Sequence, residues 1–101
     1  MNDRKKMQKA LYEYCKSDEF QQAAHEETIK IKYKRNKAQS TAGVKLKSHP
    51  IDKISGYLVF TEFWKVLNKK SELPRAQRDI IYVIGFKCLQ NKFGNNGQLR
   101  G

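Results

Sequence analysis

The sequence predicts an α+β fold for this chain of 101 residues. Two observations lead to that class. Apolar side chains recur at helical spacing near both ends of the chain, whereas two short segments in the middle alternate apolar residues with lysine. The expected order is an N-terminal helix, a basic β-hairpin and a C-terminal helix-turn-helix-like pair, an outline resembling a winged helix. The length fits a single domain, residues 1–101.

The segment from Tyr57 to Lys70 is expected to be the central core helix. At about 100° per residue, most of its apolar side chains share one half of the helix. They are Val59, Phe60, Phe63, Trp64, Val66 and Leu67. The segment also contains the only tryptophan, and Ser55 is a reasonable N-cap for it. The main apolar contribution to folding should therefore come from this segment.

Two helices are expected before the hairpin. Residues Arg4–Lys16 form an amphipathic pattern, with Asn2 or Asp3 available as the N-cap. Ser17 is followed by two acidic residues, which suit the first turn of a new helix. A break near Ser17 and a short second helix ending near His25 are therefore predicted.

The hairpin prediction comes from a change of period after Thr28. In residues 28–34, TIKIKYK, isoleucine and tyrosine alternate with lysine, and residues 44–47, VKLK, alternate in the same way. The intervening RNKAQSTAG has the composition of a loop. An antiparallel pair of half-buried strands is the simplest arrangement.

The last element is predicted to begin at Pro74, whose fixed φ suits the first turn of a helix, and to continue to about Gln90. Its IIYVIGF segment is apolar nearly all round, which suits a buried strand as well as a buried helix. Two readings stay open, a helix throughout or a helix that passes into a strand around Tyr82. The final GNNGQLRG fits a hairpin tip or a frayed end.

Charge gives the main functional signal. Lysine and arginine number 21 against 10 acids, a formal charge of +11, and no acid occurs between Glu27 and Asp52. Such an excess attracts polyanions, and lysines that neutralise phosphates supply affinity without a sequence code. We therefore predict a DNA-binding protein whose hairpin contacts phosphates and whose loop acts as a wing. The hairpin residues concerned are Lys30, Lys32, Lys34, Arg35, Lys37, Lys45 and Lys47.

A second candidate surface lies where the two C-terminal elements join. A helix, a turn at Asn68–Leu73 and a helix from Pro74 outline a helix-turn-helix, which presents the start of its second helix to bases. Arginine and glutamine suit bidentate contacts to guanine and adenine, and lysines suit phosphate. The residues concerned are Lys69, Lys70, Ser71, Arg75, Gln77 and Arg78. The alternative is an ordinary helical hairpin with charges on its surface.

Other classes find less support in the sequence. No nucleophile accompanies the two histidines, and no close pair of cysteines or histidines suits a metal, so neither an enzyme nor a cofactor or metal site is expected. Cys15 and Cys88 are predicted to be buried free thiols. No apolar run is long enough to span a bilayer, and a cytoplasmic location is expected.

Three alternatives to DNA binding remain. The first is an RNA-binding or ribosome-associated protein, in which Phe20, Tyr33 or Phe93 would stack on bases. The second is an adaptor or inhibitor that docks on an acidic protein. The third is a protein that binds to an anionic membrane. DNA is preferred over RNA and a membrane is disfavoured. A homodimer, or a protein partner within a larger nucleoprotein complex, is also compatible with the small size.

Overall fold

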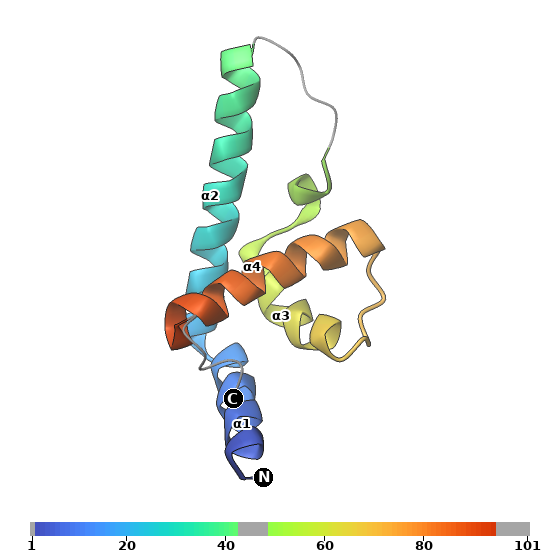
Figure 1. Ribbon diagram of the computed structural model, residues 1–101. Coiled ribbons are helices and arrows are strands. Elements are labelled where there is room, and N and C mark those ends of the chain that lie inside the picture. The colour runs from blue at the N-terminus through green and yellow to red at the C-terminus, as the bar shows by residue number, and fades with distance from the viewer. Residues whose placement is uncertain (1, 43–48, 95–101) are drawn as a thin grey trace.

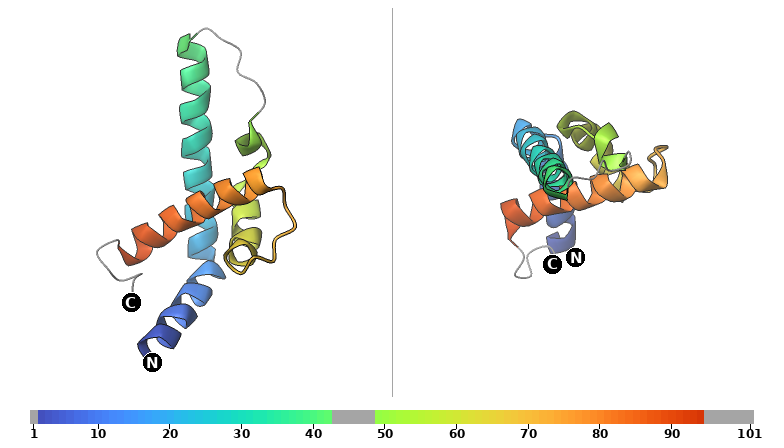
Figure 2. Two further views of the ribbon diagram at one scale, coloured as in Figure 1. Left: turned by 45° about the vertical axis from the view of Figure 1, so that its right-hand side comes forward. Right: turned by 90° about the horizontal axis from the view of Figure 1, so that it is seen from above.

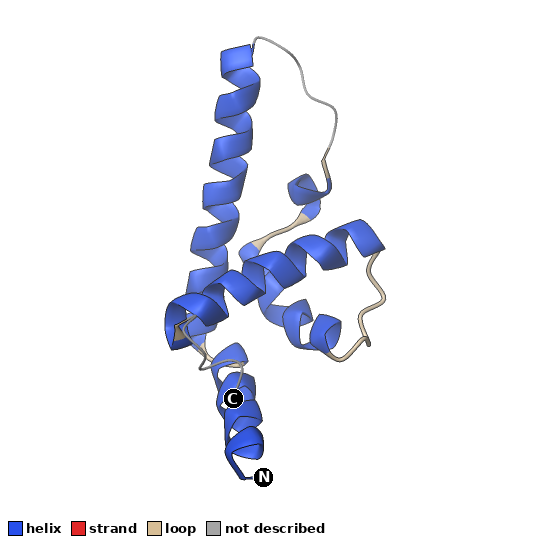
Figure 3. Ribbon diagram, in the orientation of Figure 1, coloured by secondary structure: helices blue, strands red, loops and turns tan. Residues whose placement is uncertain are grey.

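The described part of the chain is built from helices. The computed structural model describes the backbone of residues 2–42 and 49–94 and the side chains of residues 4–37 and 49–94. Within these residues there is no strand (Figure 3). The elements are α1 (Asn2–Cys15), α2 (Asp18–Ala42), a short 3₁₀ helix η1 (Pro50–Lys53), α3 (Gly56–Leu67) and α4 (Arg75–Phe93).

The helices meet around one crossing point. α2 is the longest, with 25 residues, and its C-terminal end rises beyond the other helices (Figure 1). α4 runs across both α2 and α3, and a second direction of view shows the same crossing (Figure 2). The core lies at that crossing, so the first turn of α4 and the end of α3 stand at its edge.

Every element contributes to the core. Phe63 from α3 and Phe20 from α2 are fully buried, with ring centroids 5.5 Å apart. The buried apolar residues are Tyr14, Cys15, Phe20, Ala24, Ile51, Ile54, Val59, Phe63, Ile81, Ile84, Cys88 and Leu89. The prediction of a central core helix is therefore confirmed, although its fully buried residues are Val59 and Phe63 and the rest of its apolar face is only partly covered.

Both predicted serine caps are present. The Ser17 hydroxyl accepts from the Phe20 amide at 3.2 Å, at the break between α1 and α2. The Ser55 hydroxyl accepts from the Leu58 amide at 3.0 Å, at the start of α3. Each hydroxyl pairs an N–H group that has no partner within its own helix.

The α+β class with its β-hairpin is wrong. Residues 28–34 belong to α2, which continues past His25 to Ala42 because no glycine or proline interrupts it. The core side of α2 repeats at helical spacing through Phe20, Ala24 and Thr28, while Ile29 and Tyr33 are 51% and 65% exposed. The alternation of apolar residues with lysine was thus a short local coincidence. The second predicted strand, residues 44–47, lies outside the described residues.

The last element is helical throughout. α4 begins at Arg75, directly after Pro74, and continues to Phe93, so the alternative of a strand from Tyr82 is wrong. The preceding connection runs from residue 68 to residue 74. This is longer than the turn of about three to four residues in a DNA-binding helix-turn-helix. With no hairpin among the described residues and with this longer connection, the winged-helix outline is not supported.

η1 is tied to α2 through Asp52. The Asp52 carboxylate accepts from the His49 amide and from the Arg35 guanidinium, each at 3.0 Å. The amide hydrogen bond, followed by the nearby Arg35 charge, holds the pKa of Asp52 below its usual value. Arg35, predicted to contact DNA, is therefore a link between two elements.

The two cysteines are free and buried, as predicted. Burial is the main cause that raises the pKa of Cys15 to about 12 and that of Cys88 to about 11, and the carboxylates of Glu27 and Glu26 raise the pKa of Cys88 further. Both thiols consequently remain neutral near pH 7 and act as apolar core groups.

Candidate functional site

A polar pocket lies between the end of α3 and the start of α4. Its volume is about 390 Å³. We call it the α3–α4 pocket. The residues that line it are Val66, Lys69, Ser71, Arg75, Arg78, Asp79 and Tyr82. Four of them, the two arginines, Lys69 and Ser71, were predicted from the sequence as contacts to nucleic acid. The fold therefore brings together most of the second candidate surface.

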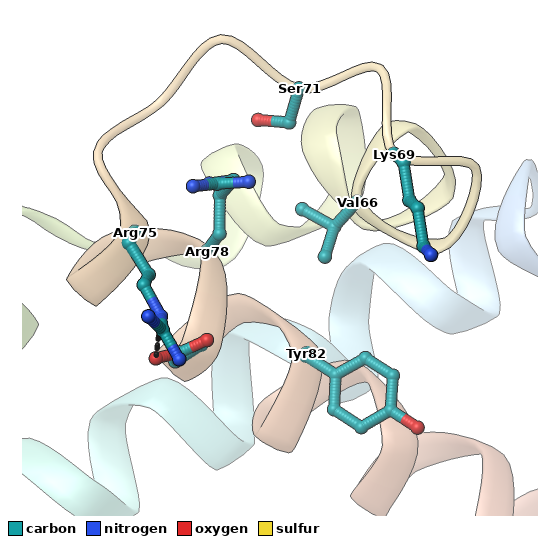
Figure 4. Close-up of a pocket in the computed structure, with 7 residues that line it drawn as sticks. Val66, Lys69, Ser71, Arg75, Arg78 and Tyr82 are labelled. Atoms are coloured by element: carbon teal, nitrogen blue, oxygen red, sulfur yellow. Dashed lines mark ion pairs between the residues drawn. The ribbon is translucent and has the colours of Figure 1, made fainter.

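The two arginines reach the pocket from one side of α4. Arg75 and Arg78 are three residues apart, so they lie almost one above the other on the helix. Their environments differ. Arg75 is highly exposed and lies 4.0 Å from the Asp79 carboxylate, whereas Arg78 extends between α4 and the connection that carries Ser71 (Figure 4).

Among the described residues, Arg78 lacks the acidic partner that Arg75 has. It is partly buried, and its Nε atom is buried with no hydrogen-bond partner. It forms no ion pair with a side chain in the described ranges, whereas Arg35 and Arg75 each have an acidic neighbour. A partly buried cation without a counterion costs free energy that an incoming anion would offset.

Lys69 is placed by an unusual backbone conformation. It has φ 58°, the left-handed region that a helix C-terminus commonly gives to glycine. The Lys70 amide donates to the Lys65 carbonyl at 2.8 Å and the Lys69 amide donates to the Val66 carbonyl at 3.1 Å. This pair of hydrogen bonds ends α3 in a Schellman motif and turns Lys69 toward the pocket (Figure 4).

Ser71 has a structural role, and its hydroxyl group is already engaged in hydrogen bonds. Its hydroxyl donates to the Glu62 carboxylate at 2.9 Å and accepts from the Leu73 amide at 3.3 Å. Both hydrogen bonds stabilise the connection between α3 and α4. Ser71 therefore shapes the wall of the pocket, and its predicted contact with bases finds no support in this geometry.

The remaining residues of the predicted C-terminal surface lie elsewhere. Lys70 lines a separate hollow with Glu62, Lys65, Glu72 and Leu73. Gln77 is about 160° from Arg75 around α4, on the side that carries the buried Ile81 and Ile84 one or two turns later. The predicted combination of arginine and glutamine side chains reading adjacent bases is therefore not formed by the α3–α4 pocket.

Three lysines of the predicted hairpin instead follow the exposed side of α2. Lys30, Lys34 and Lys37 are spaced by four and three residues, so they form one stripe, which we call the α2 lysine stripe. Lys30 is also 3.5 Å from Glu27. Lys32 is partly buried and lies near Asp52, whose pKa it helps to lower. Lys45 and Lys47 lie outside the described residues.

Three pocket residues were missed from the sequence, Val66, Asp79 and Tyr82. Val66 was assigned to the core. Tyr82 was assigned to an apolar segment of uncertain structure, although it follows Arg75 by seven residues and Arg78 by four. This spacing marks one side of a helix, so recognising that α4 is helical throughout would have placed Tyr82 beside the arginines.

The described residues were also compared with the requirements of a metal site and of a membrane-spanning helix. They contain no group of three or more His, Cys, Asp or Glu residues that could hold a metal ion. None of their helices combines the length and apolar character that crossing a membrane requires. Comparison of the chain with protein-family models, with curated protein sequences and with solved structures gives no match.

Proposed function

We propose that the protein binds nucleic acid, with the α3–α4 pocket holding a backbone phosphate. The observation that carries the proposal is the partly buried Arg78 guanidinium, which lacks an acidic partner among the described side chains and shares its pocket with Lys69 and Arg75. Phosphate oxygens accept several hydrogen bonds at once and suit the planar guanidinium of arginine.

The net charge of +11 supports a polymeric ligand over a single small anion. A polyphosphate backbone gains affinity from each cation that it meets, because each contact releases counterions. The α2 lysine stripe offers a further row of exposed cations for such contacts. The contacts are to phosphate, so they supply affinity and position without by themselves specifying a base sequence.

Arg78→Gln should weaken binding to a labelled oligonucleotide by about tenfold at moderate salt, because a charge-assisted contact to phosphate is lost. The plot of log affinity against log salt should also become shallower by about 0.7 to 0.9, the slope expected from one phosphate contact. Fluorescence anisotropy titrations over a series of salt concentrations measure both quantities.

Lys9→Gln is the matched control, since it removes the same charge from an exposed position on α1. It should leave the salt slope almost unchanged. Equal losses in the two variants would show that only net charge matters and would overturn the pocket as the phosphate site. Asp79→Asn should act in the opposite direction and tighten binding, because it removes the one acid that lines the pocket.

Lys69→Gly should separate stability from binding. Glycine relieves the left-handed backbone of residue 69 and should raise the free energy of unfolding by about 1 kcal/mol. The same change removes a cation from the pocket and should weaken oligonucleotide binding. Chemical denaturation and anisotropy titration measure the two effects.

Lys69→Ala provides the comparison for that variant. Alanine removes the charge but keeps the Cβ atom that the left-handed conformation disfavours, so it should weaken binding without stabilising the fold. If glycine and alanine gave the same stability, the strain assigned to Lys69 would be wrong. If neither variant altered binding, Lys69 would have no part in holding phosphate.

A further inference from the structure

The α3–α4 pocket combines its cations with an exposed aromatic surface. Tyr82 lines the pocket and is 44% exposed, and its ring stacks on that of Phe86, which is 36% exposed. The two ring centroids are 5.8 Å apart and the ring planes differ by only 9°. Phe86 follows Tyr82 by four residues, so the two rings are neighbours on the surface of α4.

The Tyr82 and Phe86 rings are not part of the core. The core side of α4 is formed by Ile81, Ile84 and Cys88, all buried. Tyr82, Val83 and Phe86 are exposed and leave part of their apolar surface in water. Figure 4 shows Tyr82 at the edge of the α3–α4 pocket, across from the connection and near Lys69. Aromatic rings exposed beside clustered cations are typical of surfaces that bind nucleotides.

We infer that the α3–α4 pocket binds single-stranded nucleic acid, with one phosphate held by Arg78, Arg75 and Lys69 and a neighbouring base stacked on Tyr82. This inference rests on the proposed function and specifies its ligand. In a duplex the flat faces of the bases are covered by their neighbours, so a ring on the protein cannot reach them without unstacking. An unpaired strand presents both a phosphate and a free base face, and stacking on a ring requires no particular base.

Tyr82→Leu should weaken binding of a single-stranded thymidine oligonucleotide by about 5- to 100-fold, the range expected when a stacking ring is removed. It should leave the salt dependence unchanged, because no phosphate contact is lost. Binding of an abasic strand of the same length should be weak in the parent protein and unaffected by the change. Tyr82→Trp should preserve or strengthen binding, and quenching of the added indole on titration would report the stacking directly.

Tyr57→Leu is the matched control. Tyr57 is 64% exposed on α3 and lies against Phe60, three residues later, with ring centroids 6.3 Å apart. It does not line the α3–α4 pocket. Its replacement should therefore leave binding of the single strand unchanged. If Tyr82→Leu unfolds the protein, Tyr82→Trp and the abasic strand still test the same contact.

The outcomes separate this inference from the proposed function. If duplex or abasic strands bind as tightly as the single strand, or if Tyr82→Leu has no effect while Arg78→Gln does, stacking is overturned and the phosphate pocket stands. If the parent protein binds no polynucleotide at moderate salt, the proposed function fails and this inference fails with it. A preference for the single strand that disappears in Tyr82→Leu and persists in Tyr57→Leu supports both.

Discussion

Phe63→Ala should lower the free energy of unfolding by about 3–5 kcal/mol, the usual cost of removing a buried phenyl ring and leaving a cavity. Phe63 is fully buried where α3 meets both α2 and α4, against Phe20 on one side and Gly85 on the other. A domain of this size is stable by only about 5–15 kcal/mol, so the variant should be close to unfolding at room temperature. Urea denaturation followed by circular dichroism measures the change.

Tyr57→Ala gives the comparison within the same helix. Tyr57 is exposed, and its truncation should cost less than about 1 kcal/mol. Similar losses for the two variants would contradict a core centred on Phe63. Phe63→Leu should fall between them, because leucine refills part of the volume.

Gly56→Ala should destabilise the protein by about 3 kcal/mol or more, at the upper end of what overpacking costs. Gly56 is buried at the first turn of α3, and a Cβ atom built there would collide with the backbone of His25 on α2. Backbone atoms within a helix cannot rotate away as a side chain can. The two helices would have to separate, which would disturb the core packing beneath them. Thermal and urea denaturation measure the loss.

Gly85 provides the control for Gly56→Ala, because a Cβ atom there would meet a side chain and not a backbone. At Gly85 the atoms that a Cβ would meet belong to the Phe63 ring, so Phe63→Leu should recover part of the stability lost in Gly85→Ala. No such rescue is expected for Gly56→Ala from His25→Ala, because the colliding Cα and amide nitrogen of residue 25 remain. A rescue there would show that the helices are held apart by side chains instead of by direct backbone contact.

Helix positions and caps were predictable where local signals agreed with one another. Ser17, Ser55 and Pro74 each mark a helix start that the structure contains. The residues after Thr28 misled because seven residues of alternation are too short to outweigh the helical context before them. Their exposed Ile29 and Tyr33 imitate the buried row of a strand, and only the packing of Ile31 against the core reveals the helical period.

The candidate site was predictable in its residue types but not in its shape. Arg75 and Arg78 were identified by their charge and their place near a helix start, and Lys69 by its charge and its place at the end of the preceding helix. Their convergence depends on the connection from residue 68 to residue 74 and on the left-handed turn at Lys69, and neither is evident from composition. Gln77 was grouped with them because it is adjacent in sequence, yet adjacent residues of a helix point in different directions.

Arg78 also connects the chemistry of the pocket to the melting behaviour of the protein. An unpaired buried donor weakens the ligand-free state, and an acceptor supplied from outside removes that penalty only while the chain is folded. Occupancy and folding are then linked by mass action, so the transition temperature rises with ligand concentration. Replacing the guanidinium by an uncharged side chain of similar length should make the transition temperature depend less on ligand concentration. It should also stabilise the ligand-free folded protein, because the unpaired buried donor is removed.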